Sequence, residues 1–67
     1  MAIYTKTGDK VTNIRIDGEC YASDQLIQVW GLVEGQTSSR LLYISDLHAD
    51  GGKQEIKDVI QATLKGQ

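Results

Sequence analysis

The chain has 67 residues, seven Lys and Arg against nine Asp and Glu, a formal net charge of −2 and a single cysteine. A chain this short forms one domain, residues 1–67, and its core is marginal because folding buries only about 60% of the unfolded surface. The single cysteine, Cys20, excludes a disulfide framework and a cysteine-rich metal site, so we expect self-association to supplement the core.

The charge distribution and the apolar runs bear on location and partners. The basic residues are spread along the chain, which disfavours the clustered phosphate contacts of a nucleic-acid binder: Lys6, Lys10, Arg15, Arg40, Lys53, Lys57 and Lys65. The N-terminus has no apolar run of signal-peptide length, and no segment approaches the roughly 18 apolar residues of a membrane span. With a lone thiol, these features predict a cytoplasmic protein without a membrane partner.

The first half of the chain predicts two short hairpins. Residues 3–7 and 11–16 have strand composition and are joined by a turn at Gly8-Asp9-Lys10. Asp17-Gly18 then favours a tight type I′ turn that leads residues 19–22 back along the same strand. In that register Ile14 faces Tyr21 and Arg15 faces Cys20.

The first turn also carries a short motif. The run Thr5-Lys6-Thr7-Gly8-Asp9-Lys10, followed by Thr12, resembles the N-terminal nucleotide-binding segment of the cobalamin adenosyltransferases. That resemblance implies a loop that contacts triphosphate, but it covers under a sixth of the chain, and Val11 stands where that family has glycine. Threonine and lysine around a Gly-Asp turn are equally typical of an exposed hairpin, so no activity is carried over.

In the central stretch, residues 26–33, both the odd-numbered and the even-numbered positions are mostly apolar. Because alternate side chains of a strand point to opposite faces, this stretch predicts a strand covered on both faces. A polar loop, residues 34–39, joins it to a second strand, residues 40–45. If Val33 pairs with Arg40, one face of this hairpin is aliphatic. It carries Val29, Val33, Leu42 and Ile44, with Gly31 leaving room for close approach of a helix. The other face carries Trp30, Tyr43, Leu32 and Leu41, edged by Gln28 and Ser45. A register shift of two residues would preserve both faces.

The only helical pattern lies at the C-terminus, over residues 53–65. Its apolar residues form a single stripe: Ile56, Val59, Ile60 and Leu64. The helix starts either with Asp50 as the N-cap or with Gly52 followed by Glu55 at the third position. We expect the stripe to pack on Val29, Leu42 and Ile44.

Few residues suggest chemistry. Asp46, His48 and Asp50 would project to one side of an extended backbone, but turn and capping roles explain them without a metal. His48 with Cys20 or Ser45 lacks the shaped cleft that nucleophilic catalysis needs in so small a chain. We therefore expect no enzyme activity, no metal and no cofactor.

These patterns predict a small α+β domain with four or five antiparallel strands and one C-terminal helix. The sheet is either a partly closed SH3-like barrel or an open sheet completed in a dimer. The predicted function is a non-enzymatic protein-interaction module, or a small accessory or regulatory subunit, that binds itself and another protein. The expected contact residues are Trp30, Tyr43, Leu32, Leu41, Gln28 and Tyr21. The alternatives are a single-strand nucleic-acid binder that stacks bases on Trp30, Tyr43 and Tyr21, and a ligand site assembled between subunits.

Overall fold

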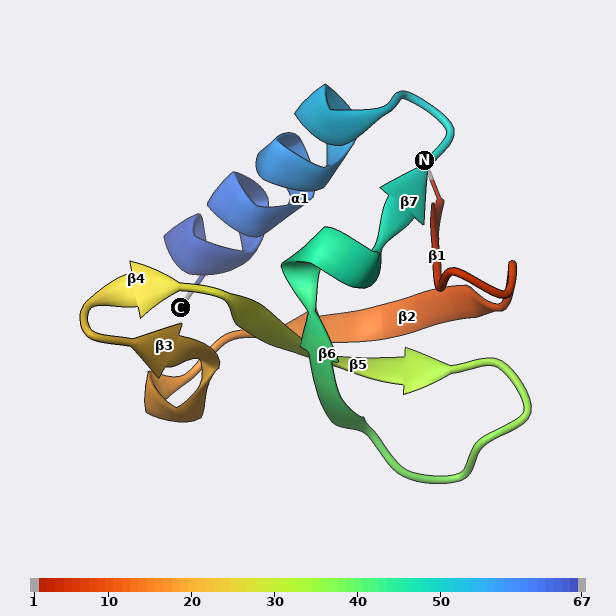
Figure 1. Cartoon of the computed structure of the whole chain (residues 1–67), viewed down its shortest axis with the longest axis horizontal. Helices are drawn as coiled ribbons and strands as arrows, with labels where there is room; N and C mark the ends of the chain where they lie inside the picture. Colours follow the sequence, from red (N-terminus) through yellow and green to blue (C-terminus); the bar gives the residue numbers. More distant parts are fainter. Residues whose placement is uncertain (1, 67) are drawn as a thin grey trace.

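The computed structural model describes residues 2–66, which form two antiparallel sheets and one long helix (Figure 1). The main sheet has the strand order β6-β5-β2-β1-β7, and β3 pairs with β4 in a separate small sheet. The strands are β1 (Ile3–Tyr4), β2 (Lys10–Arg15), β3 (Tyr21–Ala22), β4 (Gln25–Leu26), β5 (Gln28–Val33), β6 (Arg40–Tyr43) and β7 (His48–Ala49). The helices are α1 (Lys53–Lys65) and two short 3₁₀ turns, η1 (Gly18–Cys20) and η2 (Ile44–Asp46).

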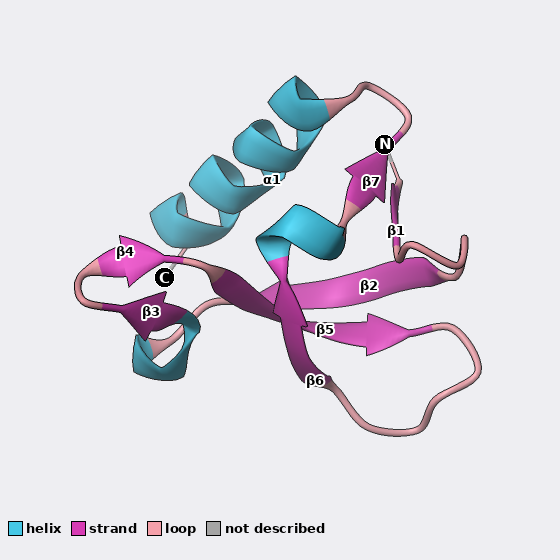
Figure 2. Ribbon diagram, viewed as in Figure 1, coloured by secondary structure: helices cyan, strands magenta, loops and turns pink. Residues whose placement is uncertain are grey.

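The main sheet curls into a half-barrel. Its last strand, β7, returns to lie beside its first, β1, so that β6 and β7 are the two edge strands and η2 joins them (Figure 2). The predicted small α+β class, with a partly closed sheet of antiparallel strands and one C-terminal helix, is therefore confirmed. Within residues 2–66, no helix is both long and apolar enough to cross a membrane.

A β-bulge in β2 produces much of the curl. Thr12 lies opposite Leu32 and Arg15 lies opposite Trp30, so β2 carries one more residue than β5 between these pairs. Asn13 occupies the bulge with φ of 56°, a left-handed conformation that Asn adopts more readily than most residues. A bulge bends its strand and strengthens the local twist. It also changes the side-chain parity, which explains why Val11 and Ile16 are both buried.

The predicted hairpin between the two central apolar runs is present with its register shifted by two residues. Trp30 lies opposite Leu41, and Val29 lies opposite Leu42. Because the shift is even, both predicted faces are preserved. The predicted strand is divided, since Leu26 belongs to β4 and β5 begins at Gln28. Along β5 the inner positions are buried and the outer ones are half-buried, so its two faces are not equally covered.

The predicted hairpin at Asp17-Gly18 is wrong. Asp17 caps η1 instead, with its side chain accepting a hydrogen bond from the Glu19 backbone N–H at 3.0 Å. The strand that follows, β3, pairs with β4 through a two-residue turn at Ser23 and Asp24, which both have the positive φ of a type I′ turn. The capped turn η1 takes the place of the predicted hairpin turn, and β2 pairs instead with β5 as far as Arg15.

The C-terminal helix has the predicted bounds, and its start follows the second predicted alternative. Gly52 is the N-cap with φ of 76°, and the buried Glu55 accepts a hydrogen bond from the Gly51 backbone N–H at 2.7 Å through Oε1. Ile56 is buried in the core, and the rest of the apolar stripe is partly buried against it. The most extensive contacts of α1 with the sheet are made with β7, which the sequence analysis did not predict.

The core lies between the concave side of the sheet and α1. Its buried apolar residues are Ile3, Val11, Ile16, Cys20, Val29, Val33, Leu47 and Ile56. The prediction that Gly31 admits the helix is wrong. A Cβ atom at Gly31 would lie 2.5 Å from Val11 Cγ1 and 3.1 Å from Leu42 Cδ1, so neighbouring strands of the sheet fill this space.

We predict that Gly31→Ala destabilises the protein by about 1–3 kcal/mol, because the new methyl group meets the stiff, β-branched Val11 in a packed core. Urea unfolding followed by circular dichroism measures the change. Gly18→Ala is the matched control, since a Cβ atom there has no neighbour within 4 Å. Equal unfolding midpoints for the two variants would contradict this account of Gly31.

Candidate functional site

Five of the six predicted contact residues lie on the outer face of β5 and β6. Trp30 is opposite Leu41, and Gln28 is opposite Tyr43. Leu32 shares the parity of Trp30 farther along β5. The sixth residue, Tyr21, is on β3, opposite Leu26 in the small sheet, and so lies outside the main sheet. The hairpin thus brings the first five together, whereas Tyr21 belongs to a different sheet.

The outer face is only partly open to solvent. Tyr43 is 53% exposed and Tyr21 is 41% exposed, and they are the exposed large hydrophobic residues among residues 2–66. Trp30 is half-buried, with the Arg15 guanidinium 4.9 Å from the centre of its ring. Cover for Trp30 therefore comes largely from its own chain, and Tyr43 is the most accessible apolar group on this face.

Asp17 organises the groups around Trp30. One carboxylate oxygen accepts a hydrogen bond from Arg15 at 3.2 Å, and the other accepts from the Glu19 backbone N–H and from the Cys20 thiol at 3.0 and 3.7 Å. Burial acts to raise the pKa of Asp17. The indole N–H of Trp30, the Glu19 backbone, the charge of Arg15 and the Cys20 thiol outweigh it and hold that pKa below its ordinary value. Asp17 therefore stays ionised and keeps Arg15 beside the ring.

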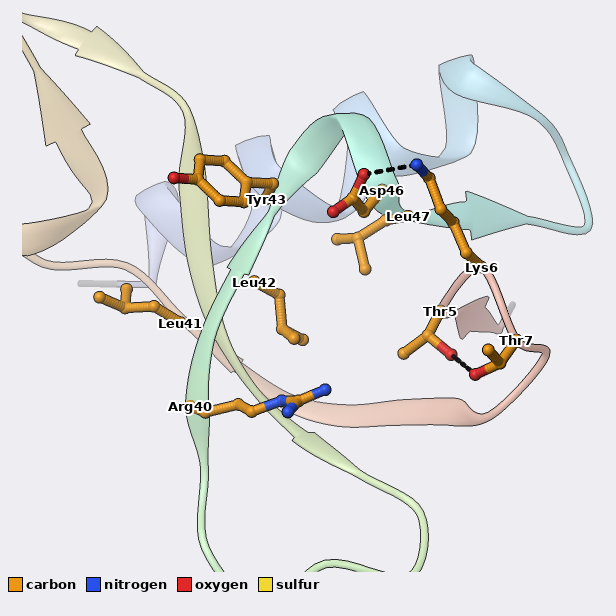
Figure 3. Close-up of a pocket in the computed structure, with 9 residues that line it drawn as sticks. All are labelled: Thr5, Lys6, Thr7, Arg40, Leu41, Leu42, Tyr43, Asp46 and Leu47. Carbon is orange, nitrogen blue, oxygen red and sulfur yellow. Dashed lines mark hydrogen bonds and ion pairs between the residues drawn. The ribbon is translucent and has the colours of Figure 1, made fainter.

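A hollow of about 340 Å³ opens on the other side of β6. It lies between β6, η2 and the loop after β1, and Figure 3 shows Arg40, Leu42 and Leu47 around it. Leu41 and Tyr43 also line it, although their side chains extend to the side of β6 opposite Arg40 and Leu42 (Figure 3). This site was not predicted. Arg40, two residues before Leu42 and therefore on the same side of the strand, was the one indication of it in the sequence.

The side chains of the loop beside this hollow form hydrogen bonds and an ion pair with other residues of the chain. Thr7 donates its hydroxyl proton to Asp9 at 2.8 Å, so the 3.0 Å contact between Thr5 and Thr7 needs Thr5 as the donor. Lys6 forms an ion pair with Asp46 at 3.1 Å. Thr5 and Thr7, in the segment that resembles a triphosphate-binding loop, thus both donate their hydroxyl protons within the turn.

The remaining candidate residues lie apart. Asp46 belongs to η2 and not to an extended strand, while His48 is exposed on β7. Cys20 is fully buried on η1, at the opposite end of the molecule from β7 (Figure 1). Within residues 2–66, no three His, Cys, Asp or Glu side chains are grouped as metal ligands would be.

A second hollow, of about 270 Å³, lies between η2 and α1. Ile44, Ile56 and Ile60 line it, with Lys53 and Lys57 at its rim. It marks the place where the apolar stripe of α1 packs against η2, the connection between β6 and β7.

Comparison of the chain with models of protein families, with curated proteins and with solved structures finds no match in any of the three.

We predict that the destabilisation caused by Asp17→Asn is larger at neutral pH than at pH 2. The folded-state pKa of Asp17 is depressed, so its carboxylate stabilises the fold above the unfolded pKa and loses this effect as the pH falls through the folded pKa. Urea unfolding of both proteins across this pH range measures the difference. A destabilisation that is independent of pH would assign Asp17 a role in capping η1 alone.

Proposed function

We propose that the protein is a non-enzymatic interaction module, a small accessory or regulatory subunit that self-associates and also binds another protein. The observation that supports the proposal is the outer face of the β5–β6 hairpin. There Tyr43 is 53% exposed beside the half-buried pair of Trp30 and Leu41. Tyrosine and tryptophan are enriched at protein interfaces because they bring large contact area at a small entropic cost.

A second copy of the chain is the occupant we favour for this face. Within residues 2–66 the core has eight buried apolar residues, and small domains without disulfides often gain stability by association. A two-fold contact places the same face of each subunit against the other, so it needs only one contact surface per chain. The outer face offers such a surface, with the exposed Tyr43 beside the half-buried Leu32 and Leu41.

The arrangement around Trp30 favours protein binding over nucleic-acid binding. Arg15 already lies over the Trp30 ring at 4.9 Å and is paired with Asp17 at 3.2 Å. A base would have to displace this guanidinium from that face of the ring before it could stack there. The net charge of −2 also opposes a polyanion. We place the protein in the cytosol, where Cys20, the single cysteine, would stay reduced.

We predict that Tyr43→Asp weakens self-association by about tenfold or more, because it puts a charge at the centre of the proposed contact. Sedimentation equilibrium at micromolar concentrations measures the dissociation constant. Gln61→Asp on the exposed side of α1 makes the same change in net charge and should leave association unaltered. A wild-type chain that stays monomeric well above micromolar concentration would reject self-association.

A further inference from the structure

The edge of β6 that faces away from β5 carries no strand within residues 2–66. Ile44 donates its backbone N–H to the Ile27 carbonyl at 3.0 Å, which fixes the alternation of the ladder. Arg40 and Leu42 therefore direct their backbone groups toward β5, whereas Leu41 directs both of its backbone groups to the free edge. Tyr43 directs its N–H to the same edge, while its carbonyl begins the turn η2, of which Tyr43 is the N-cap. An unpaired row of this kind is a ready template for another extended chain.

Two cations of the described chain, Lys6 and Arg40, line the hollow beside this edge, and Arg40 is the one without an ion pair to a described residue. Figure 3 shows Arg40 extending from β6 toward the loop that carries Thr5, on the same side of β6 as Leu42. Arg40 forms no ion pair with any described residue, in contrast to Lys6, which is neutralised by Asp46 at 3.1 Å. The two threonine hydroxyls are engaged within the loop, so an anion in this hollow would have Arg40 as its principal donor.

We propose that the free edge of β6 and this hollow bind an extended acidic peptide segment, which adds to the half-barrel as a further strand. The partner's backbone pairs with Leu41 and Tyr43, as in other cases of strand addition to a sheet edge. A carboxylate on the peptide meets the Arg40 guanidinium in a charge-assisted hydrogen bond. The inference names a partner class for the proposed interaction module, and so it rests on that function.

The geometry of β6 also fixes the pattern of the partner sequence. Arg40 and Leu42 are two residues apart on the inner face, and side chains of an added strand alternate in the same way. The residue opposite Arg40 is therefore acidic, and the residue opposite Leu42, two positions away, is aliphatic. Leu42 and Leu47 supply an apolar floor for that second side chain. A free phosphate or a lone amino acid would use Arg40 but would leave this floor and the backbone edge unused.

The test uses the full chain and a short fluorescein-labelled, threonine-rich peptide that carries one glutamate and one valine two residues apart. Fluorescence anisotropy measures its affinity, and a second peptide has lysine in place of the glutamate. We expect the glutamate peptide to bind about tenfold more tightly than the lysine peptide. Arg40→Glu should invert this preference. Lys57→Glu on the exposed side of α1 makes the same charge change and should preserve it.

Two further measurements separate strand addition from other modes of binding. Methylation of the peptide nitrogen that faces Leu41 should abolish binding, and the Leu41 and Tyr43 amides should become protected from hydrogen exchange. The proposal is overturned by equal affinities for the two peptides, by no binding at millimolar concentration, or by displacement of the peptide with free glutamate at the peptide's own concentration. Any of these failures leaves the sedimentation result intact, so it rejects the peptide site without rejecting self-association.

Discussion

The close contact of β2 and β5 around Gly31 is the constraint on which the rest of the structure depends. β1 and β7 extend the sheet from β2, and β6 extends it from β5, so each outer strand is positioned through this central pair. Because Gly31 has no side chain, the side chains of Val11 and Leu42 pack against its backbone in the space that a methyl group would otherwise fill. Val11 and Val33 are opposite one another and both are buried, so the pair also forms the centre of the core.

The curl that follows from this centre also creates the surfaces proposed for binding. The bulge at Asn13 bends β2, and the half-barrel leaves β6 and β7 as edges joined by η2 without a ladder between them. Exposed edges invite uncontrolled pairing, and inward-pointing charged residues are one way in which proteins prevent it. Arg40 on β6 fits that protective role, and in the proposed peptide site the same charge would favour a strand that brings a complementary carboxylate.

The two sides of β6 differ in chemistry because its side chains alternate. Leu41 and Tyr43 face outward beside Trp30, whereas Arg40 and Leu42 face the hollow (Figure 3). Trp30 is half-buried on the outward face, where the Arg15 guanidinium lies over its ring and is paired with Asp17. The self-contact and the peptide site that we propose would therefore use different faces of one short strand.

The sequence by itself determined the features that local periodicity encodes. These are the extent of the C-terminal helix, the antiparallel pairing of the first hairpin, the α+β class and the two faces of the β5–β6 hairpin, which survive an even register shift. The choice of Gly52 over Asp50 as the start of the helix was made only by the structure. Tertiary structure decided which strands pair. Asp17-Gly18 suits a hairpin turn and a helix cap equally well, and in the folded chain Asp17 caps η1 while β5 pairs with β2 as far as Arg15. The bulge, the cover of Trp30 and the hollow beside Arg40 depend on contacts between residues distant in sequence, so no local pattern determined them.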